Sequence, residues 1–527
     1  MRAQATRQRA VACPHAAASQ VGADVLASGG NALDAAIAMN AMLGVVYPHM
    51  CGLGGDTFIL YYSAAERRVH CLNGSGPAPT LATREAFRGR RLDAIPDRGP
   101  LSVTVPGTVG AWEEALGRLG TRPLAELLAP AAAAAESGIE VTGRLATWIG
   151  AYRDELARDQ TLSRRFLPHR RPLASGAILR QPELARSLRR LIDHGGQDMY
   201  QGEIAHKIDA AFRSAGGFLR REDLAQYSPE WCDPISVSYG GLDVYTTPPN
   251  SQGITALLML NALQVLGADE HPPGSPEHIE ALVRAKRVAF HDRDRYITDP
   301  KFLEPPIERL LHLDHARERL AAPTPADRGS GGGDTVYLCA ADAAGNACSA
   351  IQSIFYSFGS AFVAGDTGIL MQNRGQYFSL DDDHPNRLEP GKRTLHTLMA
   401  CIAMDGDDPR LVFGTMGADA QAQTNVQVLE RYLRGDSPQA AVSAPRIRHG
   451  RLYPEDDPTR LNVEERMGAE VIDELAARGH DPNVLPAYDE QVGHAHAIEL
   501  AADGTARAGS DPRSDGAAIV LTHRSRR

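Results

Sequence analysis

Apolar positions recur with helical spacing over much of the first 300 residues. In the segment that starts at Asn31, the residues Leu33, Ile37 and Ala41 repeat every four positions. The other faces of this segment are also small and apolar, so we expect a buried helix capped by Asn31. Residues 110–230 follow a mostly helical pattern in which arginines occupy the polar faces. The pattern therefore predicts a helix-rich first part of the chain.

The pattern changes across residues 322–333, which contain two prolines and end in three consecutive glycines. Such a composition is typical of flexible, exposed chain. Helices and strands alternate without a regular βαβ rhythm and without internal repeats, which favours a mixed, layered architecture over a barrel. Short apolar segments between turn signals predict strands at 335–341, 347–355, 361–371, 398–404 and 410–414.

The first two of these strands form a predicted hairpin around the loop 342–346. If the hairpin closes symmetrically, Ala341 lies opposite Ala347, and counting back places Thr335 opposite Ser353. Directly opposed residues project to the same face of a sheet. The sequence thus predicts two neighbouring hydroxyl groups at the start of the strand, and a β-bulge would shift this register.

A threonine hydroxyl is a poor nucleophile unless a base lies beside it, and the α-amine of the same residue is one such base. A free α-amine has a pKa of about 7.7–8.0, which suits a base at neutral pH. Thr335 is internal, so this chemistry requires cleavage of the Asp334–Thr335 bond. Taken alone, Thr335 is better described as the start of a strand after a linker between two domains.

Several motifs favour the catalytic interpretation of Thr335. With these motifs in this order, the chain resembles the γ-glutamyltranspeptidase family of N-terminal-nucleophile hydrolases. The resemblance covers nearly the whole chain. In it, Thr335 falls at the place of the family's nucleophile, and Ser353 at the place of a second hydroxyl that hydrogen-bonds the nucleophile. The motifs are residues 29–36, 47–55, 102–107, 248–253, 289–296 and 510–516.

The resemblance implies an α+β fold, a four-layer αββα sandwich made as one precursor that cleaves itself. The large subunit would be residues 1–334 and the small subunit residues 335–527. Gly417 and Ala418, in the glycine-rich loop 414–418, match the backbone N–H donors to the tetrahedral oxyanion. One such donor typically contributes about 3 kcal/mol to the transition state.

Both ends of the family's γ-glutamyl clamp are missing. Ser75 stands where the family has an arginine for the substrate α-carboxylate, and Tyr377 where it has an aspartate for the α-amino group. The family's paired serines become His396 and Thr397, and a family asparagine becomes Phe355. These departures resemble a branch that includes oxamate amidohydrolase and γ-glutamyltransferase-like proteins. The matching stretches are residues 372–375, 392–397 and 414–417.

The family context predicts a polar substrate pocket near Thr335. Its candidate residues are Arg374, Arg393, His396, Thr397, Ser75 and Tyr377, with His49 as a further polar neighbour. Residues 52–55 are interpreted either as an anion-binding nest or as a packed turn. His494 and His496 alternate as metal ligands can, but no carboxylate–histidine cluster accompanies them, so we expect a structural role and no metal or organic cofactor.

Composition and charge restrict the classes of partner that we expect this protein to bind. The net charge is −10 and no basic block occurs, which argues against nucleic acid or an anionic membrane as the main partner. The seven cysteines are scattered and form no CxxC pair. No apolar run has the length of a signal peptide or a membrane span, so we expect reduced cysteines and a cytoplasmic protein.

The expected function is that of an amidohydrolase or acyl transferase. The α-amine of Thr335 takes the hydroxyl proton, the hydroxyl oxygen attacks an amide carbonyl, and water or an amine resolves the acyl-enzyme. The expected substrate is an amide of a small acidic acyl group, and the alternatives are a γ-glutamyl substrate or a non-processing binding protein with the same fold. The expected protein partners are the two subunits with each other, and a dimer of the processed heterodimer.

Overall fold

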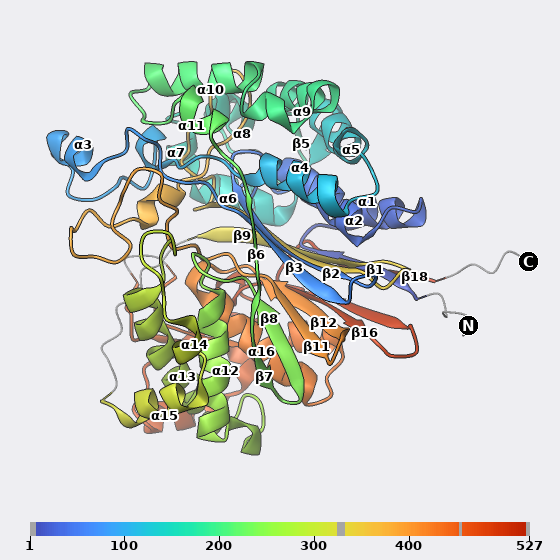
Figure 1. Ribbon diagram of the computed structural model, residues 1–527, viewed down its shortest axis with the longest axis vertical. Coiled ribbons are helices and arrows are strands. Elements are labelled where there is room, and N and C mark those ends of the chain that lie inside the picture. Colours follow the sequence, from blue (N-terminus) through green and yellow to red (C-terminus); the bar gives the residue numbers. More distant parts are fainter. Residues whose placement is uncertain (1–6, 324–332, 453–455, 523–527) are drawn as a thin grey trace, which may run out of the picture.

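Two mostly antiparallel sheets lie face to face at the centre of the protein, in a computed structural model that describes residues 7–323, 333–452 and 456–522 (Figure 1). In the first sheet the strand order is β18 (Ala517–Leu521), β1 (Arg9–Cys13), β9 (Asp334–Ala341), β10 (Ala347–Phe355), β2 (Asp56–Ser63), β3 (Arg68–Gly74) and β6 (Glu230–Cys232). In the second sheet it is β17 (Ala506–Ser510), β16 (Ala495–Leu500), β12 (Asp408–Thr415), β11 (Cys401–Asp405), β8 (Leu242–Thr246) and β7 (Ile235–Tyr239).

Helices cover the outer face of each sheet, which completes the predicted four-layer αββα sandwich (Figure 1). The first sheet is covered by α1 (Ala16–Ala27), α2 (Ala32–Val46), α4 (Thr108–Leu119), α5 (Leu124–Ser137), α9 (Pro182–His194) and α10 (Glu203–Ser214). The second sheet is covered by α12 (Gly253–Leu266), α13 (Pro276–Tyr296), α15 (Leu313–Ala321) and α16 (Gln421–Leu433).

Shorter elements complete the layers. The helices are α3 (Arg84–Gly89), α6 (Gly143–Ala151), α7 (Arg153–Leu156), α8 (Gln160–Phe166), α11 (Arg221–Ala225), α14 (Ile307–Leu310), α17 (Pro438–Ser443) and α18 (Ala469–Ala477). The strands are β4 (Ile139–Glu140), β5 (Ile178–Leu179), β13 (Ile447–His449), β14 (Leu461–Glu464) and β15 (Pro482–Leu485). Residues 110–230 are thus mostly helical, as the sequence predicts.

The buried helix that the sequence predicts after Asn31 is α2. The Asn31 side chain accepts from the Asp34 N–H at 2.9 Å, and the Asp34 carboxylate accepts from the Asn31 N–H at 2.8 Å. This reciprocal capping box satisfies two N–H groups that a helix start leaves free. Nearly every residue of α2 is buried, so the small side chains let it pack closely between the first sheet and the outer helices.

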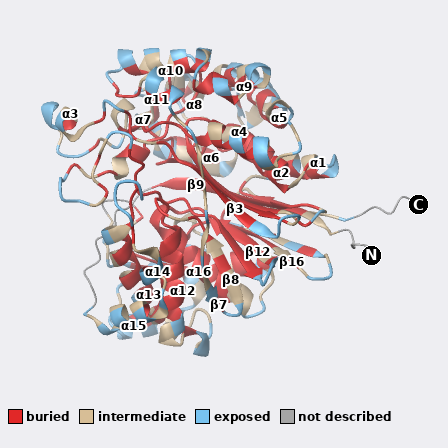
Figure 2. Cartoon of the chain, in the orientation of Figure 1, coloured by how far each residue is buried: buried red, intermediate tan, exposed pale blue. Residues whose placement is uncertain are grey.

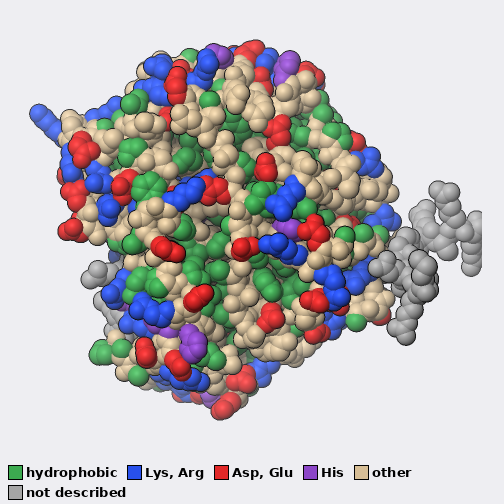
Figure 3. All heavy atoms as spheres, viewed as in Figure 1, with side chains coloured by type: hydrophobic (Ala, Val, Ile, Leu, Met, Phe, Trp, Pro, Cys, Tyr) green, Lys and Arg blue, Asp and Glu red, His purple; other side chains and the backbone are tan. Residues whose placement is uncertain are grey.

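Three apolar cores hold the layers together, two between helices and sheets and one between the two sheets. The core between the sheets includes Phe58, Tyr337 and Val412, which are all buried (Figure 2). The visible surface carries acidic and basic side chains interspersed, without one block of either sign (Figure 3). In the described part of the chain, no helix is both long and apolar enough to cross a membrane.

The hairpin register departs from the prediction at its open end. Ala341 pairs with Ala347 as predicted, and the register continues to Val336 opposite Gln352. A β-bulge follows, after which Phe355 lies opposite Asp334. The prediction that Thr335 opposes Ser353 is therefore wrong, because the bulge inserts an extra residue.

Phe355 adopts a left-handed backbone with φ 77° at this bulge. The strand predicted at 361–371 is also wrong: this segment is irregular and makes two isolated bridges, between Val363 and Leu370 and between Met371 and Gly54. The strands predicted at 398–404 and 410–414 are present as β11 and β12 with shifted ends. Most of the glycine-rich segment 322–333 lies outside the described residues.

Candidate functional site

The bond between Asp334 and Thr335 lies at the start of β9, deep inside the protein. Thr335 is 1% exposed and Asp334 is 5% exposed. The Ser353 hydroxyl donates to the Asp334 carbonyl oxygen at 2.6 Å, and the Phe355 N–H donates to the Ser353 hydroxyl at 2.7 Å. A donor aimed at a carbonyl oxygen stabilises the negative charge that develops there during nucleophilic attack. The bulge therefore directs the Ser353 hydroxyl at the Asp334 carbonyl, the predicted cleavage position.

The Thr335 hydroxyl has a neighbour that sequence reasoning missed. The Gln421 side-chain amide donates to the Thr335 hydroxyl at 3.5 Å, a long hydrogen bond between two buried groups. Gln421 is the first residue of α16, directly after the glycine-rich loop. Its position just beyond Gly417 and Ala418 is the signal from which it could have been found.

The side chain of Asp334 lies in a polar niche that the sequence also did not reveal. The Ser357 hydroxyl donates to the Asp334 carboxyl group. Burial raises the pKa of this carboxyl to about 6, against the opposing effects of Ser357 and of the Arg98 guanidinium. A second carboxyl lies nearby: burial, and then Asp334, raises the pKa of Glu490 to about 7. Two carboxyl groups that are hard to ionise thus lie near each other beside the Asp334–Thr335 bond.

Arg374 lies on the other side of Ser353, in the short turn η5 (Arg374–Tyr377). Its guanidinium donates to the Thr397 hydroxyl at 3.0 Å, reaches the Ser353 hydroxyl at 3.5 Å and lies 4.1 Å from the Phe355 ring centroid. Burial lowers the pKa of Arg374 to about 10, so the group stays charged at neutral pH. The structure thus brings together Ser353, Arg374 and Thr397 from the predicted set.

His396 is turned toward Asp56 on β2. The His396 Nε2 atom lies 3.1 Å from the Asp56 carboxylate, and Nδ1 accepts from the Leu398 N–H at 3.3 Å. This assigns the ring proton to Nε2, which donates to Asp56. Burial holds the pKa of His396 well below its usual range and raises the pKa of Asp56 to about 7. His396 is therefore a neutral group that orients Asp56, the strand neighbour of Ser353.

The predicted oxyanion loop follows β12. Gly417 and Ala418 both have positive φ, 126° and 47°, which turns the chain sharply into η6 (Ala418–Ala420). The loop lies against the residue before the scissile pair: a Cβ built on Gly333 would be 3.4 Å from the Ala418 Cβ. The Ala418 carbonyl accepts from the Gln252 side chain at 2.9 Å, which fixes the loop.

Tyr377 contacts an acidic residue that the sequence analysis did not include. The Tyr377 hydroxyl donates to the Asp419 carboxylate at 2.7 Å, and Arg293 donates to the same oxygen at 2.9 Å. Asp419 is buried, and burial raises its pKa while Arg293 opposes the shift. Asp419 directly follows Ala418, and Arg293 lies in the motif at 289–296, so both had sequence signals.

Arg393 and Ser75 belong to a separate network. In the described residues, the Arg393 side chain donates to the Ser75 carbonyl at 3.0 Å, to the Ser228 carbonyl at 3.1 Å and to Glu230 at 2.6 Å. The Ser75 hydroxyl donates to the Asn73 side chain at 2.7 Å. These bonds tie the end of β3 to β6 and to the loop before β11, and among the described residues no hydrogen bond joins Arg393 or Ser75 to Thr335.

His49, His494 and His496, the other histidines singled out in the sequence, are packed in the interior. His494 and His496 have ring centroids 5.9 Å apart, and His49 lies 4.5 Å from the Tyr47 ring. Burial lowers the pKa of His49 to about 3 and that of His496 to about 4, so both are neutral. Within the described ranges, no three His, Cys, Asp or Glu side chains are grouped to hold a metal.

Residues 52–55 form a packed turn, because their glycines allow close contact with neighbouring chain. The Gly55 N–H donates to the Gly52 carbonyl at 3.1 Å, and the Gln372 N–H donates to the Gly54 carbonyl at 3.0 Å. A side chain on Gly55 would collide with the Ser353 carbonyl. This turn therefore supports the strand end that carries Ser353.

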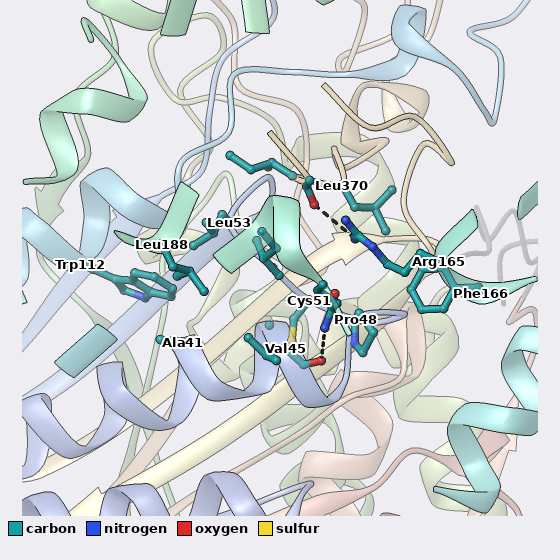
Figure 4. Close-up of a pocket in the computed structure, with 16 residues that line it drawn as sticks. Ala41, Val45, Pro48, Cys51, Leu53, Trp112, Arg165, Phe166, Leu188 and Leu370 are labelled. Carbon is teal, nitrogen blue, oxygen red and sulfur yellow. Dashed lines mark hydrogen bonds between the residues drawn. The ribbon is translucent and has the colours of Figure 1, made fainter. Parts of the chain in front are cut away.

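A cavity of about 20 Å³ lies elsewhere, between α2, α9 and the segment 368–370 (Figure 4). Its walls are mainly apolar, and Arg165 at its edge donates to the Gly368 carbonyl at 3.3 Å. None of the residues predicted around Thr335 lines it, although Gly52 and Leu53 of the packed turn do. Its volume suits about one water molecule, so it is separate from the chemistry at Thr335.

Fold and site together define an N-terminal-nucleophile enzyme that acts on amide bonds. The chain belongs to the γ-glutamyltranspeptidase family, whose model, "Gamma-glutamyltranspeptidase", matches residues 18–521. This confirms the resemblance seen in the sequence.

The chain is 40% identical over 522 residues to the "Glutathione hydrolase-like YwrD proenzyme" of Bacillus subtilis, covering 98% of this chain and 99% of the relative. It is 37% identical over 523 residues to the "Oxamate amidohydrolase proenzyme" of Klebsiella pneumoniae, covering 96% and 97%. Among solved structures, a cephalosporin acylase from Bacillus halodurans superposes with a TM-score of 0.89 at 36% identity, covering 98% of this chain and 96% of that one.

Proposed function

We propose that this protein is a proenzyme that cuts its own Asp334–Thr335 bond and then cleaves amides of a small acidic acyl group. The observation that carries the proposal is the 2.6 Å hydrogen bond from the Ser353 hydroxyl to the scissile carbonyl, inside a buried junction. A peptide bond at the start of an ordinary strand has no need for a side-chain donor on its carbonyl. Here the donor lies where negative charge develops when Thr335 attacks.

Self-cleavage then proceeds as an N-to-O acyl shift. The Thr335 hydroxyl oxygen attacks the Asp334 carbonyl carbon, and Ser353 stabilises the oxyanion. The bond to the Thr335 nitrogen breaks as that nitrogen takes a proton, which leaves an ester between Asp334 and the Thr335 side chain. Water hydrolyses the ester and yields a carboxylate on Asp334 and a free α-amine on Thr335. The products are fragments of 1–334 and 335–527.

In the processed protein the α-amine of Thr335 serves as the base. It takes the hydroxyl proton, and the hydroxyl oxygen attacks the substrate amide. The N–H groups of Gly417 and Ala418 stabilise the oxyanion, the leaving amine takes the proton, and water or an acceptor amine releases the acyl group. Gln421 fixes the rotamer of the Thr335 hydroxyl through its hydrogen bond.

The preference for an acidic acyl group rests on Arg374. This buried, charged group lies 3.5 Å from the Ser353 hydroxyl and so close to the reacting carbonyl. Leaving a buried charge without its partner typically costs about 3–5 kcal/mol. A substrate carboxylate would compensate the positive charge of Arg374 in the processed site.

A γ-glutamyl substrate is the second candidate, and Asp419 is the observation that favours it. A γ-glutamyl group carries an α-ammonium, and Asp419 offers a buried carboxylate beside Tyr377. The Arg293 contact already compensates part of this charge, which favours the first candidate.

The proposal is tested on the purified protein by intact-mass measurement and amino-terminal sequencing. The expected result is two fragments, the smaller beginning Thr-Val-Tyr-Leu, together with acylation of that fragment by an amide substrate. An active protein that remains one uncut chain would refute it.

A further inference from the structure

The first acyl group that the Thr335 hydroxyl takes is the chain's own Asp334. In this acyl group the side-chain carboxyl carbon is separated from the reacting carbonyl by two carbons, as in a four-carbon dicarboxylic acid. Hydrolysis of a substrate passes through an ester on the same Thr335 oxygen. The niche that holds the Asp334 carboxyl group before cleavage therefore indicates where a substrate carboxylate of the same reach would bind.

This niche is built from Ser357 and Arg98. Ser357 donates its hydroxyl to the Asp334 carboxyl group. The Arg98 guanidinium donates to the Ser357 carbonyl at 2.8 Å and lies 5.2 Å and 5.5 Å from the ring centroids of Tyr152 and Tyr356. Two aromatic rings and two backbone carbonyls, those of Ser357 and Gly359, thus hold the cation in place near Asp334, whose pKa it lowers against the effect of burial.

The chain before the scissile bond also crosses the predicted oxyanion loop. A Cβ built on Gly333 would be 2.7 Å from the Phe355 ring and 3.4 Å from the Ala418 Cβ. Substrate and this segment cannot occupy the same space, so the segment has to leave after cleavage. Cleavage adds a new α-carboxylate to Asp334, beside its own side chain and near Glu490. Like charges in a buried site repel, which favours departure of the segment.

We propose that Ser357 and Arg98 form a carboxylate subsite, filled by the Asp334 side chain in the precursor and by the distal carboxylate of a four-carbon dicarboxylic monoamide in the processed enzyme. This rests on the proposed function, and it names the acyl group. Arg374 lies at the reacting end, beside Ser353. Arg374 is thus the partner for a carboxylate attached directly to the reacting carbonyl, and Arg98 the partner for one that is two carbons away.

The test compares kcat/KM of the processed protein for succinyl, glutaryl and butyryl anilides. Butyryl matches succinyl in length but lacks the charge. We expect succinyl to exceed butyryl by about 10- to 100-fold, the range typical of one charge-assisted hydrogen-bonded contact, and to exceed glutaryl. Arg98→Gln and Ser357→Ala should each reduce the succinyl-to-butyryl ratio at least fivefold.

Arg90→Gln is the matched control for Arg98→Gln. Arg90 also lies over an aromatic ring, Phe218 at 4.6 Å, and donates to a backbone carbonyl, that of Gly216, but it is exposed and contacts neither Asp334 nor Ser357 in the described residues. The succinyl-to-butyryl ratio of the Arg90→Gln variant should equal that of the unmodified protein. If the Arg98 and Ser357 variants do not cleave themselves, the subsite is tested instead by inhibition of the unmodified enzyme. Succinate should then compete with butyryl anilide at least tenfold more strongly than butyrate or glutarate.

The outcomes separate the two proposals. Amide turnover with no preference for succinyl, or with a preference that survives Arg98→Gln, refutes the subsite while the proposed function stands. Equal inhibition by succinate and butyrate refutes it as well. Absence of any acylation of Thr335 by all the anilides refutes the proposed function itself.

Discussion

Replacing Ser353 by alanine removes the one side-chain hydroxyl that donates to the scissile carbonyl in the described structure. The hydrogen bond is short, 2.6 Å, and both partners are buried. Loss of one such donor typically costs about 2.7–4 kcal/mol of transition-state stabilisation, which is about 10²- to 10³-fold in rate. We therefore expect Ser353→Ala to slow self-cleavage by about two orders of magnitude.

The same change leaves the buried Phe355 N–H without its acceptor at 2.7 Å. An unsatisfied buried donor costs about 1–3 kcal/mol of folding stability. Thermal unfolding of the Ser353→Ala precursor should then shift downward while the transition stays cooperative. The stability cost and the rate cost are separable, because only the rate depends on charge that develops on the Asp334 carbonyl.

The assay follows the uncut chain by denaturing gel after cell-free synthesis, at several times up to a day. Ser353→Thr keeps a hydroxyl and should process faster than Ser353→Ala. Ser349→Ala is the matched control: Ser349 is buried on the same strand and bonds the Tyr337 hydroxyl at 2.8 Å, remote from the junction. Its loss should affect stability and leave processing within about threefold. Processing of Ser353→Ala at the unmodified rate would refute the role of the hydroxyl.

Three further predictions follow from the same site. Thr335→Ala should remain one chain on a denaturing gel, because the acyl shift needs its hydroxyl, and cleavage in that variant would contradict the mechanism. Because burial raises the Asp334 pKa from 3.8 to about 6, this carboxyl costs stability as pH rises. On the Thr335→Ala background, the free energy of unfolding relative to Asp334→Asn should fall by about 3 kcal/mol between about pH 4 and pH 7, measured by urea unfolding; a constant difference would contradict the shift. γ-Glutamyl anilide should have a kcat/KM about two to four orders of magnitude below glutaryl anilide, since the clamp residues are missing at Ser75 and Tyr377. The reverse order, abolished by Asp419→Asn, would identify Asp419 as an ammonium partner.

The β9–β10 hairpin shows how much of a strand register can be predicted from the local sequence pattern. The loop at 342–346 determines the pairing of Ala341 with Ala347. The same register then continues along the two strands as far as Gln352. The bulge beyond Gln352 depends on contacts from elsewhere: Arg374 packs over Phe355, and the turn at Gly55 presses against the Ser353 carbonyl. Those contacts join segments far apart in sequence, so the hairpin alone could not predict them.

The two predicted arginines illustrate a second limit. Arg374 and Arg393 lie in similar family motifs, but one reaches Ser353 while the other binds Glu230 and Ser75. A guanidinium reaches far from its own backbone, so its partners depend on which acceptors the fold places around it. Ser357 and Arg98 were missed for the same reason, since neither carries a motif and only the position of Asp334 connects them.

The strand order explains how cleavage of one peptide bond would form the proposed active site without dissociating the two fragments. β9 and β10, which follow the scissile bond, lie between β1 and β2, which precede it, and β18 pairs with the outer edge of β1. Separating the fragments would break three ladders of the first sheet and expose its core. In the proposed mechanism, cleavage would instead free the chain end at Asp334, which is held at the junction by pairing with Phe355 and by the hydroxyls of Ser353 and Ser357. The fold would therefore confine the consequence of the proposed cleavage to the pocket, where the proposed mechanism uses the new amine and the carboxylate niche vacated by Asp334.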